Sequence, residues 1–269
     1  MSRLPQFDDT QLASRIGHYG RRAKAIAALS AAIAIGMPQA AQAGGTVDPG
    51  FNPADFSNPL IINNPYFPLV PGTVYTYFAE GEDGCEVNIF AVLDMTRNVA
   101  GVTSRVVSDV AFEDEDCNGP TDDEIVERTN DWFAQDNSGN VWYMGEYSED
   151  CEGGDNCELS DGSWEAGVDG AIAGIQMLAT PLPGTRYYQE YYEDHAEDQA
   201  LVMRTNANVE FDESELFEDG LQNCLVTKEW SALEPGAIEH KFYCPGIGLV
   251  AVDEHHGKTL HVELTQMAP

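Results

Sequence analysis

The stretch VTSRVVSDVAF, residues 102–112, alternates along its whole length between two sets of side chains. One set is Val102, Ser104, Val106, Ser108, Val110 and Phe112, and the other is Thr103, Arg105, Val107, Asp109 and Ala111. Successive side chains of a β-strand point to opposite faces of the sheet, so this period of two predicts a strand with two distinct faces.

Similar short runs, rich in β-branched and aromatic residues and separated by turn residues, recur along the chain and are typical of antiparallel strands. The expected strands are residues 74–79, 86–93, 102–112, 127–135, 141–147, 186–192, 201–211, 225–230, 238–243, 248–252 and 260–264. Helical periodicity is nearly absent, and residues 171–179 form the one stretch that could make a helical turn. Because flat open sheets leave exposed edges, an antiparallel meander of about ten strands predicts an all-β curved sheet, half-barrel or barrel.

The N-terminal segment, residues 1–43, has the pattern of an export signal. A basic run at 21–24 precedes an apolar segment at 25–37, and AQA at 41–43 is a small-x-small cleavage pattern. We therefore expect a secreted or periplasmic protein, cleaved near Ala43. The two adjacent arginines leave the folded-export route open as an alternative. No later segment approaches the roughly 20 apolar residues of a membrane-spanning helix.

The rest of the chain divides into two parts by composition. Residues 44–63 are rich in Pro, Asn, Gly and Asp and predict an extended N-terminal arm. Residues 64–269 are expected to form a single β domain, since all-β domains of this size commonly fold as one unit.

The charge balance is strongly acidic, with 46 Asp and Glu residues against 13 Lys and Arg. Loss of the signal, with five bases and two acids, changes the formal charge from −33 to −36. Such a charge disfavours nucleic acid and anionic membrane surfaces as partners. We interpret most of it as solvation of an exported surface, and a minority of the acids as divalent-cation sites.

Six cysteines lie after the signal, namely Cys85, Cys117, Cys151, Cys157, Cys224 and Cys244. An even number in an oxidising compartment favours three disulfides, which could form in 15 pairings. Cys151 and Cys157 would close a short loop. Cys224 and Cys244 flank an expected hairpin and could meet if a bulge shifts its register, which leaves Cys85 with Cys117. A zinc site is the alternative, but its usual CxxC spacing is absent.

Five pieces of sequence resemble a family of secreted bacterial β-proteins that has no assigned function. They are NPYFPLVPGTVYTY (64–77), DWFAQDNSGNVWYMGE (131–146), GSWEAGVDGA (162–171), QEYYEDHAED (189–198) and LVTKEWSALEPGAIEHKFYCPGIGLV (225–250). More loosely, YFPLVPGTVYTY and YCPGIGLV are similar to the curved sheets of bacterial lipoprotein carriers and lipocalins. The resemblance implies an exported curved sheet, and implies more about fold than about function.

The first candidate site is the acidic loop around Cys117. Residues 114–119 place carboxylate or amide oxygens at alternate positions before a glycine, like the opening of a calcium loop. The expected calcium ligands are Asp114, Asp116, Asn118, Asp122 and Glu124. The alternative is a solvated hairpin tip tied by a disulfide, because Glu124 falls one residue short of the EF-hand position. Residues 149–161 form a second acidic loop with poorer spacing.

The second candidate group mixes imidazole with carboxylate and comprises Glu190, His195, Glu197, Asp198, Glu239, His240 and Lys241. Such a mixture suits a transition metal or general acid-base chemistry. Alternation places Glu239 and Lys241 on one face and His240 on the other. The competing interpretation is that Glu239 and Lys241 form cross-strand ion pairs with Lys228 and Glu229. A third group, His255, His256 and His261, could hold copper, nickel or zinc.

No catalytic motif accompanies these groups: the chain has no GxSxG, no HExxH and no phosphate-cradling glycine loop. Adjacent aromatic residues, as at 132–133, 142–143, 187–188 and 191–192, must place one ring of each pair outward or into a lumen. The leading hypothesis is a non-catalytic secreted protein that binds a small apolar or amphipathic ligand. One alternative is an extracellular hydrolase using Glu190, Glu197 or Asp198 with His195 or His240, and another is a structural surface or matrix protein.

Overall fold

The computed structural model describes residues 49–269 except 82–83, 155 and 256–258. The expected signal, residues 1–43, lies outside these described residues. The all-β fold is confirmed: the described residues form strands and three short 3-10 helices, without an α-helix. The 3-10 helices are η1 (Pro53–Asp55), η2 (Asp122–Glu124) and η3 (Glu215–Phe217).

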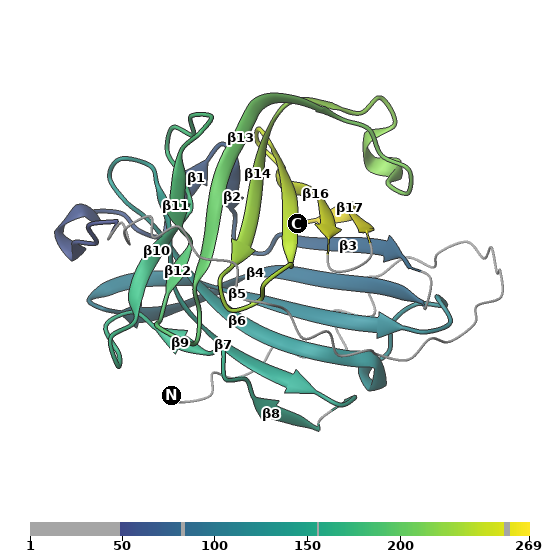
Figure 1. The fold of residues 1–269 in the computed structure, drawn as a ribbon, viewed down its shortest axis with the longest axis horizontal. Helices are drawn as coiled ribbons and strands as arrows, with labels where there is room; N and C mark the ends of the chain where they lie inside the picture. The colour runs from purple at the N-terminus through teal and green to yellow at the C-terminus, as the bar shows by residue number, and fades with distance from the viewer. Residues whose placement is uncertain (1–48, 82–83, 155, 256–258) are drawn as a thin grey trace.

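Two antiparallel meanders make up most of one 15-stranded sheet. The first contains β3 (Val74–Glu80), β4 (Cys85–Val99), β5 (Val102–Asp114), β6 (Ile125–Gln135) and β7 (Val141–Cys151). The second contains β13 (Asp198–Val209), β14 (Leu221–Ser231), β15 (Ile238–Cys244), β16 (Gly248–His255) and β17 (Thr259–Ala268). Strand β17 pairs with β3 and joins the two halves, so that the first meander crosses the lower part of Figure 1 and the second curls over it.

Shorter strands complete the sheet and its surroundings. They are β1 (Ile62–Asn64), β2 (Phe67–Leu69), β8 (Cys157–Leu159), β9 (Trp164–Glu165), β10 (Ile172–Met177), β11 (Arg186–Tyr188) and β12 (Glu190–Tyr191). Strands β1 and β2 form a separate hairpin, whereas β8, β9 and β10 all pair with β7.

The sheet is nearly closed into a barrel by one short segment of chain. Strand β11 pairs with β13, and β12, two residues later, pairs with β10 at the other end of the sheet. Gln189 lies between them and donates its backbone N–H to the carbonyl of Asp198 at 2.8 Å. Residues 186–191 therefore bring the two ends of the sheet together, beside β13 in Figure 1.

The helical turn expected at residues 171–179 is wrong, because this segment contains strand β10. Ile175 pairs with Trp142 of β7, so the edge of an existing strand supplies its hydrogen-bond partners. Gly174 permits a very close crossing: a Cβ there would lie 2.1 Å from the carbonyl oxygen of Gln189. Long-range pairing thus outweighs the local preference of the segment.

The described part of the N-terminal arm, residues 49–63, packs against the outside of β7. The rings of Phe51 and Phe56 lie 5.5 and 5.9 Å from that of Trp142, both in edge arrangements. The indole N–H of Trp142 donates to Asp136 at 2.9 Å. The outward ring of the Trp142–Tyr143 pair is therefore covered by the arm.

Three disulfides are present, as the even number of cysteines led us to expect. They join Cys85 to Cys117, Cys151 to Cys157 and Cys224 to Cys244. The last pair needs no bulge, contrary to the expectation from sequence. The register of β14 and β15 is unbroken from Glu229 opposite Glu239 to Leu225 opposite Tyr243, and it continues to the two cysteines, whose Cα atoms are 4.3 Å apart.

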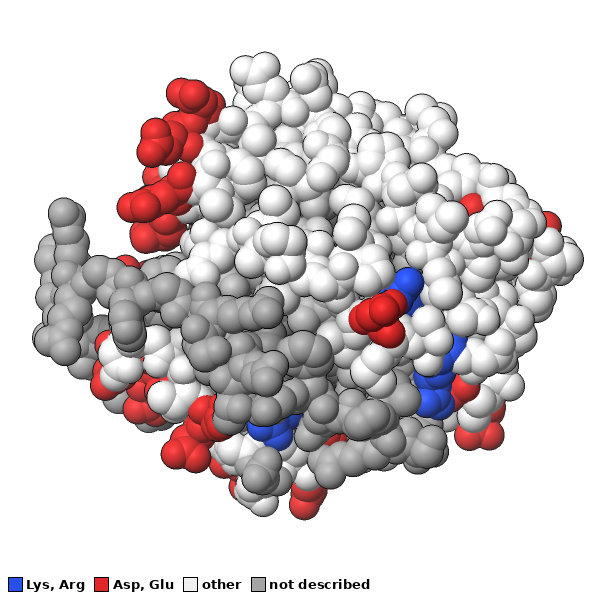
Figure 2. Space-filling model, turned by 180° about the vertical axis from the view of Figure 1, so that it is seen from behind, with Lys and Arg blue, Asp and Glu red and all other residues white. Residues whose placement is uncertain are grey.

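Acidic side chains are unevenly distributed over the surface. On the face shown in Figure 2 most of them lie towards the margins, with a dense group at the upper left, where this view places the loop between β13 and β14. That loop contains Glu210, Asp212, Glu213, Glu215, Glu218 and Asp219. Among the described residues, no helix is long and apolar enough to span a membrane.

Candidate functional site

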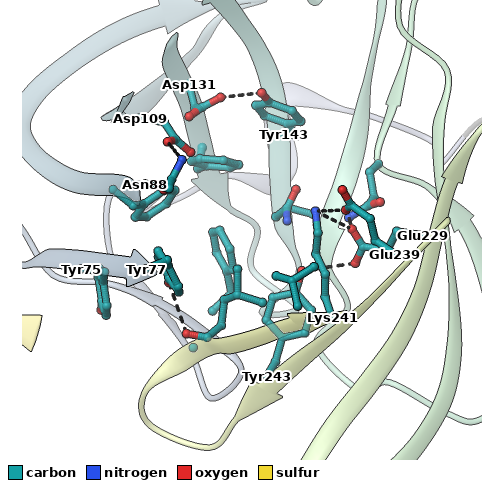
Figure 3. Close-up of a pocket in the computed structure, with 18 of the residues that line it drawn as sticks. Tyr75, Tyr77, Asn88, Asp109, Asp131, Tyr143, Glu229, Glu239, Lys241 and Tyr243 are labelled. Atoms are coloured by element: carbon teal, nitrogen blue, oxygen red, sulfur yellow. Dashed lines mark hydrogen bonds and ion pairs between the residues drawn. The ribbon is translucent and has the colours of Figure 1, made fainter. Parts of the chain in front are cut away.

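The inner face of the sheet surrounds a cavity of about 440 Å³, within the range of roughly 300–1,000 Å³ that is typical of small-molecule sites. Its aromatic side chains are Phe67, Tyr75, Tyr77, Phe90, Phe133, Tyr143 and Tyr243. Its eight acidic side chains are Asp109, Asp131, Glu146, Glu190, Asp198, Glu229, Glu239 and Glu254. Lys241 is the one basic side chain among the described residues that line it, and Figure 3 shows it on the opposite side from Asp109 and Asp131.

Strand register explains why acids from different strands face this cavity. Val107 of β5 lies opposite Asp131 of β6, so the two side chains share a face, and Asp109 joins them two residues later. Asn88 of β4 also faces inward and donates to Asp109 at 2.6 Å. The set of alternate residues that includes Val107 and Asp109 is therefore the cavity face of β5.

A bulge in β7 adds two more polar groups beside Asp131. Trp132 lies opposite Gly145 and Phe133 opposite Tyr143, which leaves Met144 without a partner and shifts the alternation by one residue. Tyr143 and Glu146, three residues apart, consequently share the cavity face. The Tyr143 hydroxyl lies 2.5 Å from Asp131 Oδ1 and 2.6 Å from Glu146 Oε2.

This triplet must hold a proton in addition to the phenol proton. One phenol hydroxyl can donate to only one of two carboxylates, so the other short contact requires a carboxyl group that donates to the phenol oxygen. Burial raises the pKa of Glu146 to about 7. Burial, together with the charges of Asp109 and Glu146, raises the pKa of Asp131 well above its ordinary value. One neutral carboxyl group per triplet at neutral pH is consistent with both shifts.

Two further carboxyl groups extend the acidic wall. Burial raises the pKa of Asp109 to about 7, although the hydrogen bond from Asn88 acts in the opposite direction. Glu190 is buried and accepts a hydrogen bond from the indole N–H of Trp164 at 2.7 Å. Burial, then the charges of Glu146 and Asp198, raises the pKa of Glu190 well above its usual range.

The opposite wall contains a compact ion-pair network. Lys241 Nζ lies 3.2 Å from Glu229 Oε2 and 2.9 Å from Glu239 Oε2. Glu229 also accepts hydrogen bonds from Gln189, Thr227 and Tyr243. Burial alone would lower the pKa of Lys241, but the two carboxylates reverse this effect and raise it well above the usual value. Lys241 is thus already paired and does not neutralise the acidic wall.

The structure brings some of the residues singled out from sequence together and separates others. Glu190, Asp198, Glu239 and Lys241 line the cavity, whereas His195, Glu197 and His240 do not. Lys228 is opposite His240 in register, so it is on the other face from Glu239. The ion pairs that form are Glu229–Lys241 and Glu239–Lys241, rather than one between Lys228 and Glu239.

The four histidines that the structure describes do not line the cavity. His195 stacks on Tyr192 with ring centroids 4.4 Å apart, and the His240 and His255 rings are 5.4 Å apart. His261 contacts Asp253 at 2.6 Å and Glu263 at 3.2 Å. His256 lies outside the described residues. In the part of the chain that the structure describes, no histidine belongs to a group of three or more metal-ligating side chains whose ligand atoms lie within 4.8 Å of one another.

The acidic loop around Cys117 brings three of its five expected calcium ligands together. Ligand atoms of Asp114, Asp116 and Glu124 lie within 4.8 Å of one another. Asp114 already accepts backbone hydrogen bonds from Asn118 and Gly119, and Glu124 accepts from the backbone and hydroxyl of Thr121. The second acidic loop is adjacent, since Gly154 donates to the carbonyl of Asp122 at 2.8 Å.

Sequence reasoning did not single out Asp109, Asp131, Glu146 or Glu229 as functional residues, and it included Tyr143 only among the adjacent aromatic residues that could face a lumen. For Asp109 a signal existed, because it is the acidic member of a strand face that also contains Val107 and Ala111. For Tyr143 and Glu146 the signal was hidden by the bulge. Of the adjacent aromatic pairs, Phe133 and Tyr143 face the cavity, whereas Trp132 and Trp142 do not line it.

No family model matches the chain, and no curated protein matches it. Two crystal structures are similar to it. One is a presumed exported protein with a YmcC-like fold from Bacteroides fragilis, with 12% identity over 76% of this chain and 99% of that chain and a TM-score of 0.40. The other is a presumed lipoprotein from Parabacteroides distasonis, with 10% identity over 76% of this chain and 98% of that chain and a TM-score of 0.35.

Proposed function

We propose that this chain is an exported, non-catalytic binding protein that holds a small amphipathic ligand inside its barrel. The observation that supports this most is the cavity of about 440 Å³, whose wall combines aromatic rings with polar side chains from both meanders. Concave sites of this size and mixed lining are the usual form of small-molecule binding sites. Export is proposed from the signal pattern at residues 21–43.

The alternatives considered from sequence fit the geometry less well. A histidine-assisted hydrolase needs His195 or His240 beside the acids, and neither lines the cavity. A structural surface or matrix protein would need no interior cavity, and this fold surrounds one.

Binding of the neutral dye N-phenyl-1-naphthylamine to the mature protein tests the proposal. We expect saturable fluorescence enhancement with one site per chain. Val252→Phe should weaken it, because Val252 lines the cavity opposite Lys241 in register and the larger ring would project into the space for the dye. Val168→Phe is the matched control, because Val168 is exposed and outside the cavity. Absence of saturation, or equal binding by both variants, would refute an interior site.

We also propose that the paired acidic loops bind a divalent cation such as calcium. The arrangement of Asp114, Asp116 and Glu124 supports this, since hard cations prefer several converging oxygens. A cation that binds only the folded state raises the unfolding midpoint. Thermal melts in millimolar calcium and in chelator should therefore differ, and the difference should vanish in Asp116→Asn/Glu124→Gln. An unchanged midpoint across millimolar calcium would exclude the site.

A further inference from the structure

The cavity contains more acidic groups than its one lysine can pair with. Glu229 and Glu239 share Lys241, at 3.2 and 2.9 Å. Besides Glu254 of β16, five other acids line the cavity from β5, β6, β7, β12 and β13, namely Asp109, Asp131, Glu146, Glu190 and Asp198. None of the five has an ion pair with a basic side chain in the described part of the chain, so the acidic wall lacks a cation.

Two of these acids are deeply buried and have an oxygen without a donor. Asp131 is 6% exposed and Glu190 is 9% exposed. Asp131 accepts through Oδ1 from Tyr143, and Glu190 accepts through Oε2 from Trp164. Among the described residues, no hydrogen-bond donor reaches the second oxygen of either group. Neither second oxygen is among the fully buried, unpaired side-chain atoms of the described residues, so in the cavity each is open to water and to a donor on a bound ligand.

The spacing of the acids does not suit a metal ion. A hard cation requires several oxygens that converge on one point. Among the described residues, the only group of three or more potential ligands within 4.8 Å is Asp114, Asp116 and Glu124, which lies outside the cavity. The cavity acids are instead distributed along the wall, which suits an extended cation with several positive groups.

The aromatic lining suits the carbon chain of such a cation. Phe133 stacks on Tyr143 with centroids 4.9 Å apart, and Phe67 packs against Phe133 at 5.3 Å. Ring faces attract ammonium groups, and they also bury the methylene groups between them. Beside them, the Tyr143 hydroxyl contacts Asp131 and Glu146.

We infer that the cavity binds an organic oligoamine, with ammonium groups donating to Asp131 and Glu190 and the carbon chain lying against Phe133 and Tyr143. This rests on the proposed function and specifies its ligand class. The ammonium groups would donate to the second oxygens of these two carboxyl groups, and they balance the acidic wall without requiring convergence on one point.

Isothermal titration of the mature protein with three probes of equal chain length tests the inference. The probes are 1,8-diaminooctane, octylamine and 1,8-octanediol. We expect one site per chain, at which the diamine binds at least roughly tenfold more tightly than the diol, because charge-assisted hydrogen bonds are the stronger ones. The affinity of octylamine should lie between those of the diamine and the diol. A diol that binds as tightly as the diamine would overturn the inference.

Variants separate the cavity from the acidic surface. Asp131→Asn/Glu190→Gln keeps shape and an oxygen that accepts from Tyr143 and Trp164, and it should weaken diamine binding at least roughly tenfold. Glu215→Gln/Glu218→Gln removes the same number of acidic groups from the exposed loop before β14 and should change binding less than twofold. Equal weakening in both variants would indicate unspecific attraction and contradict the inference.

The two proposals fail in different ways. If N-phenyl-1-naphthylamine binds to the unmodified protein but the diamine shows no preference over the diol, the oligoamine inference fails and the interior site stands. If neither the dye nor any of the three probes binds, the interior site itself is refuted. The probe series on the unmodified protein decides the inference even if the double variant does not fold.

Discussion

Among single residues, Tyr143 has the clearest role: its hydroxyl allows Asp131 and Glu146 to lie side by side. Asp131 and Glu146 are directly opposite each other on paired strands, an arrangement that is destabilising when both are charged. The phenol between them, at 2.5 and 2.6 Å, allows a shared proton to replace that repulsion. The bulge of β7 is what brings the phenol to this position.

Tyr143→Phe should therefore destabilise the protein although it removes a single oxygen atom. Both carboxyl groups lose their hydrogen-bond partner in a buried site, which costs about 1–3 kcal/mol of unfolding free energy. Urea unfolding at pH 7 measures this loss. Tyr191→Phe on β12 is the control, and similar stability of the two variants would contradict the role assigned to the Tyr143 hydroxyl.

The raised carboxyl pKa values also predict how stability depends on pH. Asp109 and Glu146 titrate near pH 7 in the folded protein and near pH 4 when unfolded, so the folded state binds more protons between these values. Their contribution is fully present below about pH 4 and is lost as the pH rises through about 7.

The guanidinium concentration at the unfolding midpoint should therefore decrease as the pH rises from 5 to 8. Asp109→Asn/Glu146→Gln should make the stability less dependent on pH. At pH 8 it should raise the free energy of unfolding by an amount on the order of 1–3 kcal/mol per group. Guanidinium unfolding across the pH range measures it. An equally steep slope in the double variant would assign the pH dependence to other groups.

At the scale of elements, the β7 bulge depends on a glycine. Gly145 has φ of +133°, and a Cβ there would lie 2.5 Å from the carbonyl oxygen of Trp164 in β9. Gly145→Ala should cost at least about 2 kcal/mol, because it combines backbone strain with a steric clash. Gly162→Ala, whose Cβ would meet nothing closer than 3.7 Å, should cost less than about 1 kcal/mol. Comparable losses measured by urea unfolding would argue against a constrained bulge.

The same bulge shows what sequence could and could not predict. Alternation along the sequence was sufficient to predict strand β5 and to place His240 on the other face of its strand from Glu239 and Lys241. It failed for Tyr143 and Glu146, because residues three apart in a regular strand face opposite sides and only pairing with β6 reveals the shift. Strand β10 and the crossing at Gln189 likewise depend on partners far away in sequence.

At the scale of the whole molecule, the charge of −33 predicts a strong effect of salt. Surface carboxylates repel one another, and the Debye length shortens from about 30 Å at 0.01 M to about 10 Å at 0.1 M. The thermal midpoint should therefore rise by several degrees between these ionic strengths at pH 8, and by less at pH 5, where the buried carboxyl groups take up protons. A midpoint that does not depend on salt at pH 8 would contradict dominant self-repulsion.

The closure of the sheet by residues 186–191 also affects how copies of the chain meet one another. The end strands β11 and β12 contain three and two residues, and they cover Gln199–Leu201 of β13 and Ile172–Ala173 of β10. Long free edges are the usual starting points for intermolecular strand pairing and aggregation. A chain in which residues 186–191 had not docked would therefore expose the edges of β13 and β10 at these positions to strand pairing with another copy.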